Sequence, residues 1–124
     1  MNCIRFGNGC FNIPSSEQSV DLVIGAKSEA DSLEDFVERA VKYLCDEVYF
    51  ESLESAFSEI INKPAGENGE ALIRELMDGM NTKTEFKFER ILNIIYITEP
   101  KWNSYEFAFE TENGYVLFLW GTTA

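Results

Sequence analysis

The side chains that most often carry out catalysis in proteins are scarce in this sequence, whereas carboxylates are abundant. The chain has 22 Asp and Glu residues, 10 Lys and Arg residues and no His, which gives a net charge of −12. Without His it lacks the commonest general base and the commonest metal ligand. Its three Cys therefore have no His to activate them as nucleophiles. We predict that the protein is not an enzyme and holds no metal and no cofactor.

The carboxylates are concentrated in one part of the chain, since residues 29–59 contain ten acidic and two basic residues. Some of them have an ordinary structural role on a helix surface. Asp35 and Arg39 are spaced to form an i,i+4 ion pair, as are Glu38 and Lys42. Glu34 precedes or opens a predicted helix, where the helix dipole favours negative charge. These residues need no functional explanation.

The acidic residues near the end of the same predicted helix lack such an explanation. Negative charge at a helix C-terminus is unfavourable by ~0.3–1 kcal/mol for each residue. Aromatic residues interleave with the acids there, which suits an interface with a cationic and partly apolar protein surface. The alternative is a solvated bend with its aromatic rings turned inwards. The partner-binding residues predicted in this region are Asp46, Glu47, Tyr49, Glu51 and Glu54.

Three helices are predicted in the middle of the chain. Apolar residues at helical spacing indicate a first helix that is capped by Ser32 and ends near Val48. A second apolar stripe at 53–61 lies on the opposite helical face, so a break is expected at 49–52. A third helix is expected to start after Asn68 and to end around Gly79 to Asn81.

Strands are predicted on both sides of these helices. At the N-terminus, Asn8-Gly9 favours a type I′ hairpin that places Phe6 opposite Phe11, and a short strand follows at 20–24. At the C-terminus, the apolar run at 91–97 indicates a central strand with a bulge near Arg90. Asn113-Gly114 indicates a second type I′ hairpin. The fold class is therefore α+β, as a single domain over residues 1–124 with a C-terminal antiparallel sheet.

The C-terminal hairpin has one face that must be core and one of mixed character. With Glu112 opposite Tyr115, Phe107 lies opposite Trp120, and these two residues share a face with the other aromatic residues. The second face is covered by helices or is an open partner-binding surface with an acidic rim. Three helices are enough to cover one face of such a sheet but scarcely enough to cover both faces. We therefore expect the second face to be open. The binding residues predicted on it are Glu106, Glu110, Glu112 and Tyr115.

A small acidic α+β domain without catalytic residues resembles the immunity proteins that neutralise bacterial toxins of the colicin and contact-dependent growth-inhibition kinds. The resemblance is one of size, charge and missing chemistry, and it covers the whole chain. It implies a stoichiometric inhibitor that forms a tight complex with a basic toxin, commonly a nuclease domain. Because the resemblance rests on no shared motif, it assigns no binding residue in this sequence.

Two other classes of function fit the composition. One is a phage- or plasmid-encoded nucleic-acid mimic that blocks a host defence enzyme, although acids concentrated in 29–59 do not form a duplex-like double row. The other is a small carboxylate-based enzyme or ligand-binding domain. Net charge argues against binding nucleic acid. The longest apolar run, at 115–120, is too short for the ~20 residues that cross a bilayer.

The cysteines bear on the cellular compartment. Cys3, Cys10 and Cys45 are an odd number without metal-ligand spacing, and we interpret them as small buried hydrophobic residues. This usage is typical of a reducing compartment, so we predict a cytoplasmic protein. A disulfide between Cys3 and Cys10 is left open.

Overall fold

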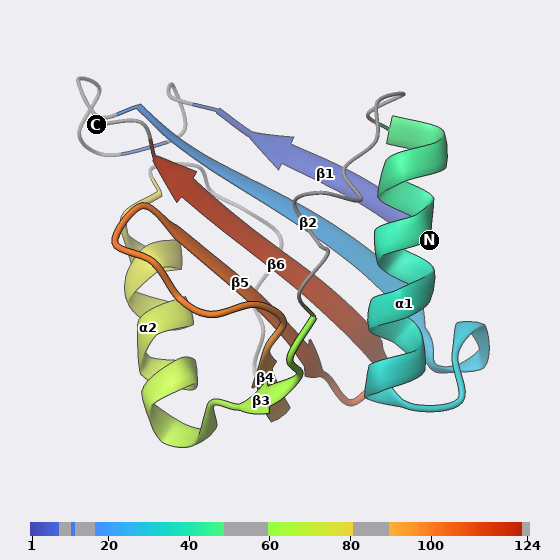
Figure 1. Cartoon of the computed structure of the whole chain (residues 1–124). Helices are drawn as coiled ribbons and strands as arrows, with labels where there is room; N and C mark the ends of the chain where they lie inside the picture. Colours follow the sequence, from blue (N-terminus) through green and yellow to red (C-terminus); the bar gives the residue numbers. More distant parts are fainter. Residues whose placement is uncertain (8–10, 12–16, 49–59, 81–89, 123–124) are drawn as a thin grey trace.

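The computed structural model describes residues 1–7, 11, 17–48, 60–80 and 90–122, and Figure 1 shows its layers. Six strands form one antiparallel sheet in the order β1-β2-β6-β5-β4-β3. Helix α1 (Leu33–Tyr43) lies on one face of this sheet and α2 (Gly66–Asp78) on the other. The strands are β1 (Asn2–Phe6), β2 (Gln18–Ala26), β3 (Lys63–Pro64), β4 (Leu92–Tyr96), β5 (Ser104–Glu110) and β6 (Gly114–Thr122). The mixed α+β class is therefore confirmed.

The sheet is apolar on both faces because each face packs against a helix. On the α1 side, Val23, Leu117 and Ala108 of the three central strands meet the buried side of the helix. On the α2 side, Leu22, Phe118 and Phe107 of the same strands belong to the core cluster that contains Ile73 of α2. Successive residues of a strand point to opposite faces, so a sheet covered on both sides needs nearly continuous apolar runs. Strand β6 has such a run, since residues 115–118 are all buried.

The expectation of an open second face is wrong. Tyr115 is only 5% exposed, and its ring stacks on Phe36 of α1 with 5.2 Å between the ring centroids. Leu117 on the same face is fully buried. The expectation placed every helix on one side of the sheet. With one helix on each side, two helices bury both faces, and Tyr115 becomes core.

The C-terminal hairpin forms where it was predicted, but its turn is not type I′. Strand pairing places Glu110 opposite Tyr115, and the backbone N–H of Thr111 donates to the carbonyl oxygen of Gly114 at 2.9 Å. Neither Asn113 nor Gly114 has a positive φ, which a type I′ turn requires of both central residues. Gly114 instead lies in β6, where a Cβ would collide with the carbonyl oxygen of Gly25 in β2.

This turn shifts the predicted register by two residues. Phe107 lies opposite Phe118 rather than Trp120, and Tyr105 lies opposite Trp120. Because side chains alternate with a period of two, a two-residue shift leaves every side chain on its predicted face. The aromatic face was therefore assigned correctly although its cross-strand pairs were not.

The first predicted helix begins as expected. The Ser32 hydroxyl accepts a hydrogen bond at 3.1 Å from the backbone N–H of Asp35, which confirms the N-cap. After Tyr43 the helix widens into a π-helical turn, Leu44–Val48. Helix α2 starts at Gly66, earlier than predicted, and ends with Gly79 as its C-cap.

The described residues contain two α-helices where three were predicted. The second predicted helix falls on 53–61, most of which lies outside the described residues, and residues 60–62 are not helical. None of the helices in the described ranges is long and apolar enough to span a bilayer.

The predicted N-terminal pairing is wrong, although the strand after it is confirmed within β2. Phe6 at the end of β1 lies opposite Val20 of β2, and Phe11 forms an isolated bridge with Met80. Phe11 is buried in the core beneath α2, so its contacts are with a part of the chain that is distant in sequence. The Asn8-Gly9 turn lies outside the described residues.

A bulge interrupts β4, as predicted, but it lies at Asn93 rather than near Arg90. Leu92 is opposite Glu110 and Ile95 is opposite Ala108, so β4 has one residue more than β5 between these pairs. The bulge is accommodated at Asn93, whose φ of 48° is a left-handed conformation that Asn tolerates. The bulge brings the Asn93 side chain to Glu110.

Candidate functional site

Of the partner-binding residues predicted around the end of the first helix, Asp46 and Glu47 are described. Both are exposed and lie in the π-helical turn that follows α1. Tyr49, Glu51 and Glu54 lie outside the described residues. The turn is fixed by Leu44, which is fully buried in the core beneath α1 and whose N–H donates to the carbonyl oxygens of the preceding helical turn. Asp46 and Glu47 therefore extend from a well-anchored segment.

The outer side of α1 carries two further exposed carboxylates, Glu34 and Glu38. The predicted ion pair between Asp35 and Arg39 is present at 2.9 Å, whereas Glu38 and Lys42 form none. No hydrogen bond or ion pair neutralises Glu34, Glu38, Asp46 or Glu47 in the described part of the chain. We call these four residues the acidic strip.

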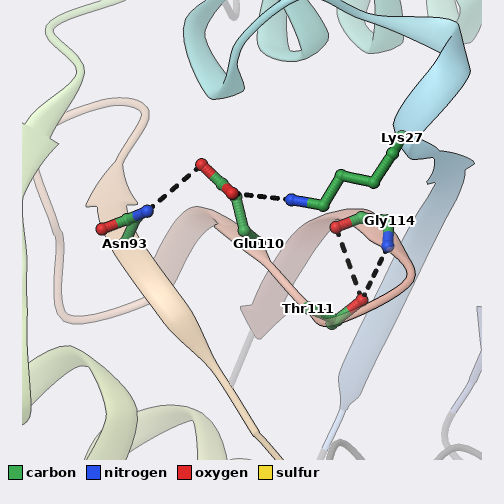
Figure 2. Close-up of polar contacts among 5 residues, drawn as sticks. All are labelled: Lys27, Asn93, Glu110, Thr111 and Gly114. Atoms are coloured by element: carbon green, nitrogen blue, oxygen red, sulfur yellow. Dashed lines mark hydrogen bonds and ion pairs between the residues drawn. The ribbon is translucent and has the colours of Figure 1, made fainter.

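The acidic residues of the C-terminal hairpin differ from the strip because each has a partner within the protein. Figure 2 shows Glu110 between Lys27, whose Nζ donates to Oε2 at 2.6 Å, and Asn93, whose Nδ2 donates to Oε1 at 3.2 Å. Lys27 also lies 4.5 Å from the centre of the Tyr115 ring. The hydrogen bond from Lys27 holds the pKa of Glu110 below its usual range, against the opposing effect of burial. Glu110 thus joins β5, the bulge of β4 and the turn after β2.

Glu106 and Glu112 also have partners within the protein, but Glu106 is largely buried and Glu112 is exposed. The hydroxyl of Thr98 donates to Glu106 at 2.9 Å. Burial raises the pKa of Glu106, and the Thr98 hydrogen bond and the charge of Lys101 only partly offset this. Glu112 lies 3.7 Å from Arg90, with both side chains largely exposed. An exposed pair of this kind contributes only ~0.2–1 kcal/mol.

The structure separates the two groups of predicted residues. Helix α1 starts at the end of the sheet that carries the 111–114 turn and runs away from it, so that its π-helical turn lies at the far end of the helix from that turn, as Figure 1 shows. Tyr115 is buried and does not offer its ring to a partner at the surface. The acidic strip is therefore the candidate site, and the C-terminal hairpin acts mainly as its support.

The Glu110 contacts predict a pH-dependent contribution to stability. We expect Glu110→Gln to lower the free energy of unfolding by about 1 kcal/mol at pH 7, because a hydrogen bond between charged groups is lost. The folded pKa is lowered, so this contribution is present above the unfolded pKa and is lost as pH falls through the folded pKa. Urea unfolding at pH 7 and in acid measures it. Equal losses at both pH values would contradict the role of the charge.

Sequence reasoning missed the most exposed aromatic side chain of the described residues. Trp102 is 72% exposed at the turn between β4 and β5. The backbone groups of Lys101 and Ser104 close this turn with hydrogen bonds of 2.9 and 3.3 Å, so the ring is carried on a fixed loop. The turn itself was predicted at 100–103, and a Trp within a turn was the available signal.

The described residues offer little for metal or thiol chemistry. No group of three or more Cys, Asp, Glu or His that could hold a metal ion occurs within them. Cys3 and Cys45 are free thiols, and both are half-buried. Burial raises the pKa of Cys3, and Asp21 adds to the rise while Arg5 opposes it. A thiol with a raised pKa is a poor nucleophile.

Comparisons of the chain with protein-family models, with curated proteins and with solved structures found no significant match. A function must therefore be argued from the geometry and charge of the acidic strip.

Proposed function

We propose that this protein is a stoichiometric inhibitor that binds a basic partner protein through the acidic strip. In its specific form it is an immunity protein for a bacterial toxin such as a nuclease. One observation supports the proposal above all others. Four exposed carboxylates along α1 and its π-helical turn form no hydrogen bond or ion pair with a cation in the described residues.

Parts of the strip are electrostatically unfavourable in the free protein, although Glu34 itself lies in the first turn of α1, where the helix dipole favours negative charge. Glu34 and Glu38 are like charges at i,i+4 on one helix, which destabilises that helix by a few tenths of a kcal/mol. Asp46 and Glu47 lie at the negative end of the helix dipole, where each costs ~0.3–1 kcal/mol. A cationic partner surface relieves both repulsions. Unfavourable charge that a partner can neutralise is typical of a binding surface.

The strip is also held in place before any partner binds. Phe36, Val37 and Ala40 on the inner side of α1 are fully buried against the sheet. A surface that keeps its shape on binding loses little conformational entropy, and this favours tight complexes. A rigid helix whose inner side is buried and whose exposed residues include Glu34 and Glu38, next to Arg39 and Lys42, therefore suits a permanent inhibitor better than an adaptable one.

A nuclease is a partner of the right chemistry. Proteins that bind the phosphate backbone use clusters of Lys and Arg, and an acidic protein competes for the same surface. Complementary charge raises association rates to ~10⁸–10⁹ M⁻¹s⁻¹ at low salt. Such rates suit an inhibitor that must capture its target before the target acts.

Replacing charge in the strip should slow association without unfolding the protein. We expect Asp46→Asn/Glu47→Gln to reduce the association rate at low salt on the order of tenfold and to flatten its dependence on salt. The partner is first isolated by affinity capture from the producing cell and then purified. Stopped-flow mixing at two salt concentrations measures the rates, and titration of the partner's activity tests for complete inhibition at an equimolar ratio.

A variant with the same change in net charge provides the control. Glu75 on α2 and Glu99 after β4 are exposed and lie outside the strip. We expect Glu75→Gln/Glu99→Gln to leave association nearly unchanged. If both variants slow association equally, net charge alone is responsible and the strip is not the interface. If the strip variant associates like the wild type, the proposal is wrong.

A further inference from the structure

The two outer strands of the sheet differ in how their edges are protected. An outer strand has backbone N–H and C=O groups that point away from its single neighbour, and most proteins keep these groups from pairing with another chain. Within the described residues, β1 and β3 are the outer strands (Figure 1). Strand β3 consists only of Lys63 and Pro64, both exposed. Its short length, its charge and its proline, which has no N–H, protect this edge.

Strand β1 lacks these protections. It has five residues, Asn2–Phe6, with no proline, no glycine and no bulge in its pairing with β2. Its one charged side chain, Arg5, is directed to the neighbouring strand, because its Nε donates to Asp21 of β2 at 3.2 Å. This ion pair is neutral, so β1 adds no net charge here, although the whole chain has a net charge of −12. The outward backbone groups of β1 form what we call the β1 edge.

The side chains of β1 are compatible with those of a second β1 that runs antiparallel to it. Full overlap of two such five-residue strands places Ile4 opposite Ile4 of the second copy. Cys3 then lies opposite Arg5, and no two like charges face each other directly. Asn2 lies opposite Phe6. Ile4 is half-buried and belongs to neither core cluster, so its side chain is available to pack against that of the second copy.

We propose that the β1 edge pairs with the β1 edge of a second copy of this chain. The product is a symmetric dimer in which one antiparallel sheet continues through both copies. About four to six backbone hydrogen bonds then satisfy the outward groups of both strands. A strand of a basic partner fits this edge less well, because Arg5 is the only charged residue of β1. This inference goes beyond the proposed function, because β1 and the acidic strip share no residue.

Sedimentation equilibrium of the full chain from about 10 μM to about 1 mM measures the dimer, for which we expect a Kd of roughly 10–100 μM. The affinity is modest because five residues on each side form a small interface. Hydrogen–deuterium exchange locates the contact. Amides of β1 should exchange more slowly at high protein concentration, whereas the exchange of Lys63 in β3 should not depend on concentration. Because both copies are acidic, raising the salt concentration should lower the Kd by about twofold to fivefold.

A charge placed at the symmetry axis tests the pairing. Ile4→Lys sets two like charges opposite each other and should raise the dimer Kd about tenfold or more, with an unchanged circular dichroism spectrum. Glu99→Gln makes the same change in net charge at an exposed position outside β1 and should leave the dimer intact. A monomer at 1 mM, β1 exchange that does not depend on concentration, or equal Kd values for the two variants would each overturn the proposal. The exchange measurement on the wild type requires no variant to fold.

The strip variant separates this inference from the proposed function. Asp46→Asn/Glu47→Gln should dimerise at least as tightly as the wild type, because it removes charge without touching β1. Loss of the dimer in that variant, or a dimer that weakens as salt is added, would mean that the acidic strip forms the contact, which would also overturn the proposal. The association kinetics of the strip with the basic partner are measured at about 1 μM, where a Kd of about 10–100 μM leaves the chain monomeric. Failure of the dimer therefore leaves those kinetics as they were.

Discussion

Phe107→Ala is expected to lower the free energy of unfolding by about 3–5 kcal/mol, as measured by urea unfolding. Phe107 is fully buried in the core beneath α2. Its ring lies 4.8 Å from that of Tyr96 and 6.2 Å from those of Tyr105 and Phe118, measured between centroids. Strands β4, β5 and β6 all contribute to this group, so removing the central ring leaves a cavity that no single side chain can fill.

Trp102→Ala is the control for this change. It also removes an aromatic ring, but from a position that is 72% exposed, and surface changes usually stay within about 0.5 kcal/mol. A loss below about 1 kcal/mol in Phe107→Ala, or equal losses in the two variants, would show that the aromatic face of β5 and β6 does not form the core.

Tyr115→Ala is expected to cost about 3 kcal/mol, because a buried aromatic ring is removed from between the sheet and α1. The ring stacks on Phe36 and also lies beside the ammonium group of Lys27. Its removal therefore weakens the packing of α1 and loosens the Lys27–Glu110 contact. Thermal or urea unfolding followed by circular dichroism measures the loss.

The conservative variant Tyr115→Phe keeps the ring and removes only the hydroxyl group. We expect it to cost less than about 1 kcal/mol, since the predicted loss comes from packing and stacking. If Tyr115→Ala is as stable as the wild type, the ring does not support α1, and the second face of the sheet behaves as an open surface after all.

Features with local causes were predictable from the sequence. The Ser32 cap depends on residues three positions apart, and the aromatic face of β5 depends on strict alternation. Even the wrong turn at Asn113-Gly114 left the face assignment intact, because the error was an even number of residues. The exposure of Asp46 and Glu47 was likewise expected, since a buried carboxylate at a helix end would be strongly unfavourable.

Features with distant causes were not predictable in the same way. The partner of Glu110 is Lys27, which is 83 positions away in the sequence, and no periodicity points to it. The bridge between Phe11 and Met80 also joins residues that are far apart in the chain. The bulge of β4 lies at Asn93, whereas it was predicted near Arg90, three residues earlier and before the start of this strand. Pattern reasoning identifies elements and faces, whereas their neighbours in space follow from the packing of the whole chain.

The antiparallel pairing of β2 with β6 has a consequence for how the protein is made. Val20 lies opposite Trp120, one hundred residues later, and β6 separates β2 from every strand except β1. At translation rates of ~5–20 residues per second, β2 waits about 5–20 seconds before β6 has been synthesised. During that time Val20, Leu22 and Val23, which are fully buried in the finished protein, lack their partners in β6. The sheet can therefore close only after β6 has been synthesised, and until then the apolar residues of β2 are exposed to aggregation.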